Sequence, residues 1–108
     1  MSYSVKTIPR FERDLKRLAK KYPSLKGEYF GLVESLKEQP VQGTALGNNC
    51  YKIRISIASK GKGKSGGARV IAYLQVSLTT VYLLDIFDKS EQENISDKEI
   101  RSLLDLIP

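Results

Sequence analysis

The feature of this chain that most constrains its fold is the segment CYKIRISIAS, residues 50–59, in which apolar and polar side chains alternate strictly. The apolar positions are Tyr51, Ile53, Ile55 and Ile57. The positions between them include Lys52 and Arg54. Because side chains of a strand have a period of two, this pattern predicts a strand with one apolar face and two neighbouring cations on the other.

Two more apolar, β-rich runs follow, at residues 69–78 and 80–87, with a short turn between them. Arg69 opens the first of these runs, and Lys89 follows the end of the second. If the three runs pair as a sheet, four cations converge on its uncovered side. The candidate functional cluster consists of these cations: Lys52, Arg54, Arg69 and Lys89.

The remaining elements are predicted from periodicity and from helix-breaking residues. A short strand at residues 3–8 precedes a helix at 10–22, and Pro23 separates that helix from a second one at 25–39. Residues 41–49, VQGTALGNN, are rich in turn-forming residues and are predicted to be a loop. A last helix at 96–107 begins with a capping box, Ser96 followed by Glu99.

This order predicts one α+β domain spanning residues 1–108: an N-terminal strand, a helical hairpin, an antiparallel β-meander and a C-terminal helix. The hairpin is expected to cover one face of the sheet and to leave the other partly open.

Charge is unevenly distributed along the chain. Fifteen Lys and Arg stand against five Asp and Glu in residues 1–75, a net charge of +10, whereas residues 76–108 hold three against seven, a net charge of −4. A basic body of this kind favours a polyanionic partner, with nucleic acid as the first choice.

Several classes of function are excluded by composition. The chain has no His and one Cys, so it lacks the residues for His-based triads and for most zinc sites, and no cofactor or metal is expected. Its N-terminus shows no apolar signal segment and no run is long enough to cross a membrane, which predicts a cytoplasmic protein without a membrane partner.

Two further groups of cations are predicted to bind RNA. One group lies along the predicted first helix: Arg13, Lys16, Arg17 and Lys20. The other lies in the Gly-rich segment SKGKGKSGG, which is interpreted as a mobile loop with no residue able to pack: Lys60, Lys62 and Lys64. The alternatives are a solvated helix face and a simple flexible connector.

The chain resembles the RelE/ParE superfamily of bacterial toxins, most closely its HigB-like branch. The strings that carry the resemblance are FERDLKRLAKKYP, CYKIRI, GGARVIAYL and VYLLDIFDKSEQENISDKEI, which together span nearly the whole sequence. The resemblance implies a RelE-like fold, a cognate antitoxin as partner, and a toxin that cuts mRNA on the ribosome and so contacts rRNA. It also implies that the family's basic site positions fall on the four cations named above, which are therefore the predicted catalytic residues: Lys52, Arg54, Arg69 and Lys89.

One departure from the family keeps other functions open. Several relatives carry a Tyr or His near the C-terminus, and the comparable stretch SEQENI has neither. Lys52 and Lys89, or the nearby carboxylates of Glu91 and Glu93, are the alternative acid or base groups, although both glutamates also fit a solvated surface. The competing hypotheses are a ParE-like inhibitor of DNA gyrase without nuclease activity, and an inactive relative that only binds an antitoxin.

Overall fold

The computed structural model describes residues 2–60 and 66–108, and within them one five-stranded sheet and three α-helices. The strands are β1 (Ser4–Thr7), β2 (Thr44–Gly47), β3 (Cys50–Ile55), β4 (Ala68–Gln75) and β5 (Thr80–Asp88). The helices are α1 (Pro9–Lys21), α2 (Leu25–Glu38) and α3 (Asp97–Leu104). The predicted α+β class and the predicted order of helices are confirmed.

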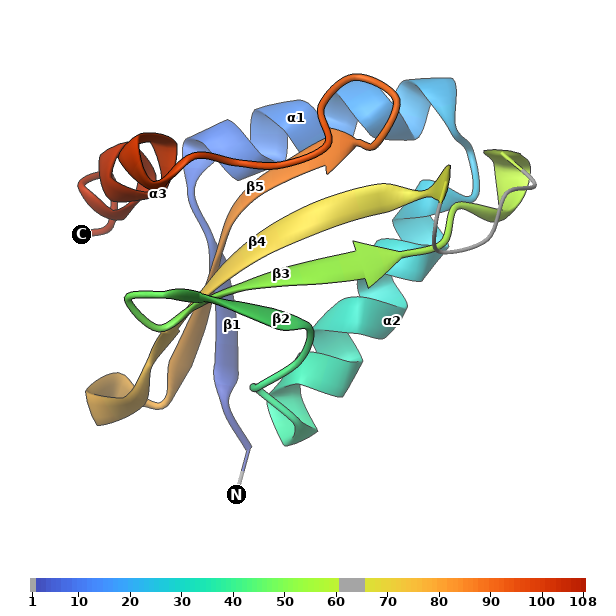
Figure 1. The fold of residues 1–108 in the computed structure, drawn as a ribbon. Helices are drawn as coiled ribbons and strands as arrows, with labels where there is room; N and C mark the ends of the chain where they lie inside the picture. The colour runs from blue at the N-terminus through green and yellow to red at the C-terminus, as the bar shows by residue number, and fades with distance from the viewer. Residues whose placement is uncertain (1, 61–65) are drawn as a thin grey trace.

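The sheet has the strand order β1-β5-β4-β3-β2, with β4 at its centre (Figure 1). Strands β2 to β5 pair antiparallel with their neighbours, whereas β1 pairs parallel with the first half of β5. The meander is therefore confirmed, and the N-terminal strand makes the sheet a mixed one. A parallel pair needs a long crossover connection, which here contains both helices of the hairpin and three strands.

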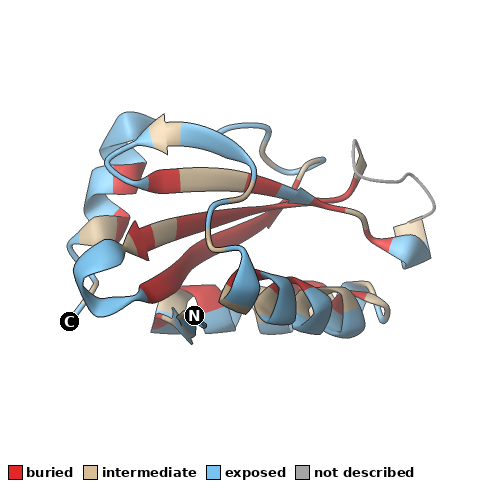
Figure 2. Cartoon of the chain, turned by 90° about the horizontal axis from the view of Figure 1, so that it is seen from below, coloured by how far each residue is buried: buried red, intermediate tan, exposed pale blue. Residues whose placement is uncertain are grey.

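The main core lies between the sheet and the helices α1 and α2 (Figure 2). Phe11 and Leu18 of α1 and Leu25 of α2 are fully buried, as their helical spacing predicts. The Phe11 and Tyr29 rings lie 5.7 Å apart between centroids and join the two helices. This layer leaves the opposite face of the sheet partly open to polar side chains.

Helix α3 packs against β5 and buries Ile100 and Leu103. Its cap forms as the sequence predicts, because the Ser96 hydroxyl accepts a hydrogen bond from the Glu99 amide at 3.1 Å. The C-terminal helix thus has a defined start and a buried apolar stripe.

The predicted loop at residues 41–49 is wrong in part, because it contains strand β2. Residues of β2 are largely exposed and do not alternate, so the strand depends on backbone pairing with β3. Gly43 makes this pairing possible: its φ is +86°, and a Cβ atom there would overlap the Lys52 carbonyl. Such a strand cannot be predicted from a hydrophobic pattern in the sequence.

The segment that opens the basic loop also differs from its prediction, because two of its residues do pack. The Ser59 amide donates to the Ser24 hydroxyl at 3.0 Å, and Lys60 is largely buried. Ser24 stands at the start of α2 but makes no capping bond with its side chain. The rest of the predicted mobile loop, residues 61–65, lies outside the described residues.

Among residues 2–60 and 66–108, no helix has the length and apolar character needed to cross a membrane.

Candidate functional site

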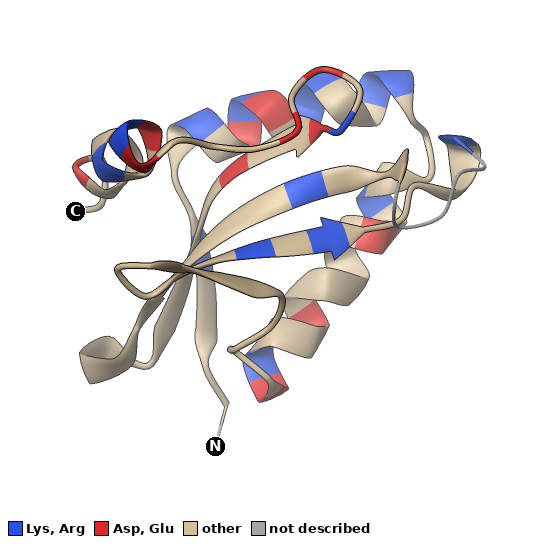
Figure 3. Ribbon diagram, in the orientation of Figure 1, with Lys and Arg blue, Asp and Glu red and all other residues tan. Residues whose placement is uncertain are grey.

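The face of the sheet opposite α1 and α2 carries the predicted cations. Strand β3 supplies Lys52 and Arg54, and the register of the antiparallel pair places Arg54 directly across from Arg69 of β4 (Figure 3). Lys89 follows β5, and its amide donates to the Gly67 carbonyl at 3.1 Å, which fixes it beside the start of β4. Side chains directly opposite in an antiparallel pair share one face, so these cations face the same side.

These four residues line one pocket of about 270 Å³, together with Glu93 and Asn94 from the segment between β5 and α3. The alternation in β3 and the two flanking strands therefore bring together the side chains that the sequence singled out. Their roles in catalysis stay a prediction. Asn94 was missed, because a single amide in a loop carries no pattern that points to a site.

Arg69 is the most buried cation of the pocket, with a residue exposure of 3%. Its guanidinium donates to the Ala68 carbonyl at 3.2 Å. Burial and the facing Arg54 both lower the pKa of Arg69, while Glu93 raises it in part. Two guanidinium groups that line the same pocket from paired positions create a strong positive potential, which an incoming phosphate would offset.

Lys52 is oriented by the segment that borders the pocket. Its ammonium donates to the Asn94 side-chain oxygen at 2.9 Å, and the Gln92 amide group donates to the Asn94 carbonyl at 2.9 Å. Of the two predicted acid/base glutamates, Glu93 lines the pocket.

Glu91 lies away from that pocket and is paired with helix α1. The Arg17 guanidinium contacts both of its carboxylate oxygens, at 3.1 and 3.3 Å. Hydrogen bonding to Glu91 raises the pKa of Arg17. The structure thus joins a predicted acid/base residue to a predicted RNA-binding residue and separates both from the four cations.

Asp88, at the end of β5, was not predicted from the sequence and connects three segments. Its fully buried carboxylate accepts hydrogen bonds from the Tyr22 hydroxyl and the Lys60 ammonium, each at 2.6 Å, and from the Ser90 amide at 3.0 Å. Burial by itself would raise the pKa of Asp88, but these donors outweigh it and hold the pKa well below its usual range. Asp88 thereby anchors the turn that contains Lys89 and the start of the basic loop.

The predicted RNA-binding residues fall into different environments. Arg13 is exposed, and Lys16 and Lys20 border a hollow of about 470 Å³ on α1 together with Lys26. Lys60, by contrast, is bonded to Asp88 and its side chain is only 10% exposed. Lys62 and Lys64 lie outside the described residues.

Within the part of the chain that the structure describes, no group of three or more His, Cys, Asp or Glu side chains could hold a metal ion. Cys50 is buried, and burial raises the pKa of its thiol to about 11, so it is not a reactive nucleophile at neutral pH.

Three solved structures share this fold with the chain: two of a toxin and one of a toxin–antitoxin complex. A free arginine-to-alanine double mutant of the Escherichia coli toxin RelE matches with a TM-score of 0.63 and 16% identity, over 86% of this chain and 90% of that one. The isolated E. coli RelE toxin matches with a TM-score of 0.60 and 16% identity, over 98% and 100%. The Mycobacterium tuberculosis toxin–antitoxin complex RelBE2 matches with a TM-score of 0.59 and 17% identity, over 82% and 99%. The fold therefore defines this protein as one of the small α+β proteins with the RelE architecture.

The sequence identifies the family within that class. The family described as the RelE toxin of the RelE/RelB toxin–antitoxin system matches residues 11–106. The chain belongs to the RelE toxin family, as the resemblance predicted. The narrower likeness to the HigB-like branch stays a prediction.

Proposed function

We propose that this protein is a ribosome-dependent endoribonuclease that cuts mRNA without a metal ion and thereby inhibits translation. The observation that carries the proposal is that Lys52, Arg54, Arg69 and Lys89 line the same pocket. Membership of the RelE toxin family supports the toxin function. The pocket supplies what such a cleavage needs, which is a concentration of cations around one phosphate.

The reaction is an internal transesterification. A base removes the proton of the 2′-hydroxyl, the 2′-oxygen forms a bond to the adjacent phosphorus, the bond from phosphorus to the 5′-oxygen breaks, and an acid protonates that oxygen. The products are a 2′,3′-cyclic phosphate and a 5′-hydroxyl. Arg54 and Arg69 are suited to the charge that develops on the phosphorane oxygens, because a guanidinium can donate to two oxygens at once.

The proton transfers are assigned to residues that line the same pocket. Glu93 is the carboxylate there and suits the base role, while Lys52 or Lys89 suits the acid that protonates the leaving oxygen. Glu91 is not assigned a role, because it is held by Arg17.

The basic surface of α1 is proposed to position the toxin on the ribosome. Lys16 and Lys20 are exposed on the same helix as Arg13, and their charges can follow the phosphates of rRNA. The toxin would then act in the cytoplasm, where ribosomes carry mRNA.

A cognate antitoxin is the proposed protein partner. The mycobacterial structure that shares this fold is a toxin–antitoxin complex. We expect the antitoxin to cover the cationic open face of the sheet with an acidic segment, because charge complementarity of this kind gives both fast association and specificity.

The test is cell-free translation of a reporter mRNA, with mapping of the new 5′ ends. We expect wild type to produce cuts that require the ribosome, and Arg69→Ala to lower the cutting rate by about 100-fold or more, the loss typical of removing one stabilising donor. Lys6→Ala is the matched control, because Lys6 is an exposed cation on β1 outside the pocket.

If Arg69→Ala cuts mRNA at the wild-type rate, Arg69 has no role in catalysis. If wild type makes no cuts while the extract translates normally, the nuclease proposal fails. A supercoiling assay with DNA gyrase then tests the ParE-like alternative.

A further inference from the structure

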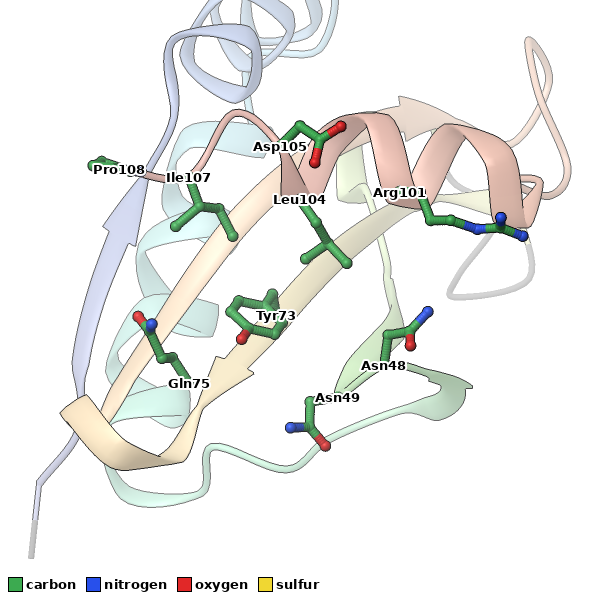
Figure 4. Close-up of a pocket in the computed structure, with 9 residues that line it drawn as sticks. All are labelled: Asn48, Asn49, Tyr73, Gln75, Arg101, Leu104, Asp105, Ile107 and Pro108. Carbon is green, nitrogen blue, oxygen red and sulfur yellow. The ribbon is translucent and has the colours of Figure 1, made fainter.

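A second and larger hollow lies on the open face of the sheet, between α3 and the β2–β3 turn (Figure 4). Its volume is about 990 Å³. Tyr73 and Gln75 of β4 form its floor, Asn48 and Asn49 of the turn form one side, and Leu104 of α3 forms the other. None of these residues belongs to the cationic pocket.

The hollow and the cationic pocket lie on the same face and share strand β4. Tyr73 pairs with Cys50. Cys50, Lys52 and Arg54 occupy every second position of β3 and share one face, so Tyr73 faces the same side as these cations. Arg69 and Tyr73 are four positions apart on β4, which corresponds to about 13 Å at the rise of a strand. A short segment of single-stranded RNA can bridge this distance.

The polar groups of the hollow suit the edge of a base. Asn48, Asn49 and Gln75 each offer a donor and an acceptor. The Gln75 side-chain oxygen is buried, and no residue that the structure describes donates a hydrogen bond to it. A buried acceptor without a partner costs free energy, so turning the Gln75 amide toward an N–H group of a ligand in the hollow would be stabilising.

The turn that presents the two asparagines has a defined shape. Asn48 and Asn49 have φ values of 54° and 59°, as a two-residue type I′ hairpin requires, and the Leu74 amide donates to the Asn49 carbonyl at 2.9 Å. The Tyr73 ring is half-buried beside Leu104, which leaves part of it open for stacking. Amide groups that read base edges next to an aromatic ring are the usual elements of single-stranded RNA recognition.

We infer that this hollow is a base-binding site: it takes one base of the RNA strand whose scissile phosphate lies in the cationic pocket, stacked on Tyr73 and hydrogen-bonded to Gln75 and the asparagines. The inference rests on the proposed function. It makes the hollow the part of the protein that selects sequence, at a fixed distance from the cut.

The first experiment measures binding without cleavage. The side-chain amide signals of Asn48, Asn49 and Gln75 are followed by NMR in an Arg69→Ala protein during titration with the four nucleoside 5′-monophosphates. We expect these signals to shift with at least one nucleotide, and Tyr73→Leu to weaken binding by about 10-fold or more, as loss of a stacking partner does. Gln75→Leu is the second variant, and Gln39→Leu, an exposed amide at the end of α2, is the control.

The second experiment compares the sequences around the cuts made on translated mRNA by wild type and by Gln75→Leu. We expect the variant to cut more slowly at the preferred sequences and to lose base preference at one position, at a constant offset from the cut. Cutting with unchanged preference, together with silent amide signals, overturns the base-binding site and leaves the proposed function in place. If the amide signals shift with nucleotides but the wild-type protein cuts no mRNA, the base-binding site is supported and the nuclease proposal is overturned.

Discussion

Two buried aspartates of β5 show how the surroundings of a side chain decide its ionisation. Asp88 is held by Lys60, Tyr22 and the Ser90 amide, and its pKa lies far below the usual range. Burial raises the pKa of Asp85 to about 6, although the Arg10 guanidinium lies 3.3 Å from its carboxylate and opposes the shift. Three donors surround the Asp88 carboxylate, whereas Asp85 has two, the Arg10 guanidinium and the Ile86 amide, and the neighbouring Asp14 adds to the upward shift of its pKa.

Asp85 should make the folded protein less stable as the pH rises from about 4 to 6. In this window the native state holds a proton on Asp85 that the unfolded chain, with its ordinary carboxyl pKa, has already released. Asn at position 85 cannot titrate. We therefore expect the free energy of unfolding of Asp85→Asn, relative to that of wild type, to increase by about 2 kcal/mol between the lower and the higher pH. Urea unfolding at both values measures this change.

Asp105→Asn is the control for this experiment, because Asp105 is exposed at the end of α3. Its effect on the free energy of unfolding should stay the same at both pH values. A constant difference for Asp85→Asn as well would contradict the raised pKa.

At the scale of the element, strand β2 depends on backbone geometry and not on a hydrophobic pattern. It pairs with β3 over Lys52, Tyr51 and Cys50 and ends in the hairpin turn that borders the larger hollow. Its position therefore affects β3, which carries two cations of the site, and the turn that carries the two asparagines.

Gly43→Ala should disrupt the start of β2. The positive φ and the overlap of the new Cβ with the Lys52 carbonyl both oppose the change, so we expect a loss of about 2 kcal/mol or more in the free energy of unfolding. The rate of hydrogen exchange of the β3 amides should increase as a result. Gly31→Ala in α2 is the matched control and should stabilise the protein by about 1 kcal/mol, because the space around Gly31 is open.

If Gly43→Ala is as stable as wild type, the close approach of β2 to β3 is not required for the fold.

At the scale of the whole molecule, cations occupy two surfaces that face different directions. One is the pocket on the open face of the sheet, and the other is the outer surface of α1 (Figure 3). The proposed function uses the first for cleavage and the second for docking on the ribosome. Binding and cleavage should therefore be separable by mutation.

The double variant Lys16→Ala, Lys20→Ala should weaken ribosome binding in a salt-dependent way. Each lost phosphate contact lowers the slope of log affinity against log salt by about 0.7–0.9, so we expect the slope to fall by about 1.5. The measurement is sedimentation with ribosomes across a salt series, using an Arg69→Ala background to prevent cleavage.

Lys37→Ala, which removes a cation paired with Glu34 at 2.7 Å on α2, should leave this slope unchanged. An unchanged slope for the double variant would mean that α1 does not contact rRNA phosphates.

The sequence by itself determined those features that depend on local patterns. Alternation in residues 50–57 predicted strand β3 and the side on which Lys52 and Arg54 lie, and helical spacing predicted α1, α2 and α3. These predictions succeeded because apolar side chains must be buried on one face of each element. The family resemblance then predicted that Arg69 and Lys89 lie in the same site as that pair.

Only the tertiary structure decided the features that depend on contacts between distant residues. The parallel pairing of β1 with β5, the strand β2, the bond from Lys52 to Asn94 and the buried Asp88 network all join segments far apart in the chain. The same holds for the hollow beside α3, whose residues come from β4, the β2–β3 turn, α3 and the residues that follow α3. A sequence pattern records which face of an element is apolar, but which polar groups meet on the other face is set only when the elements pack.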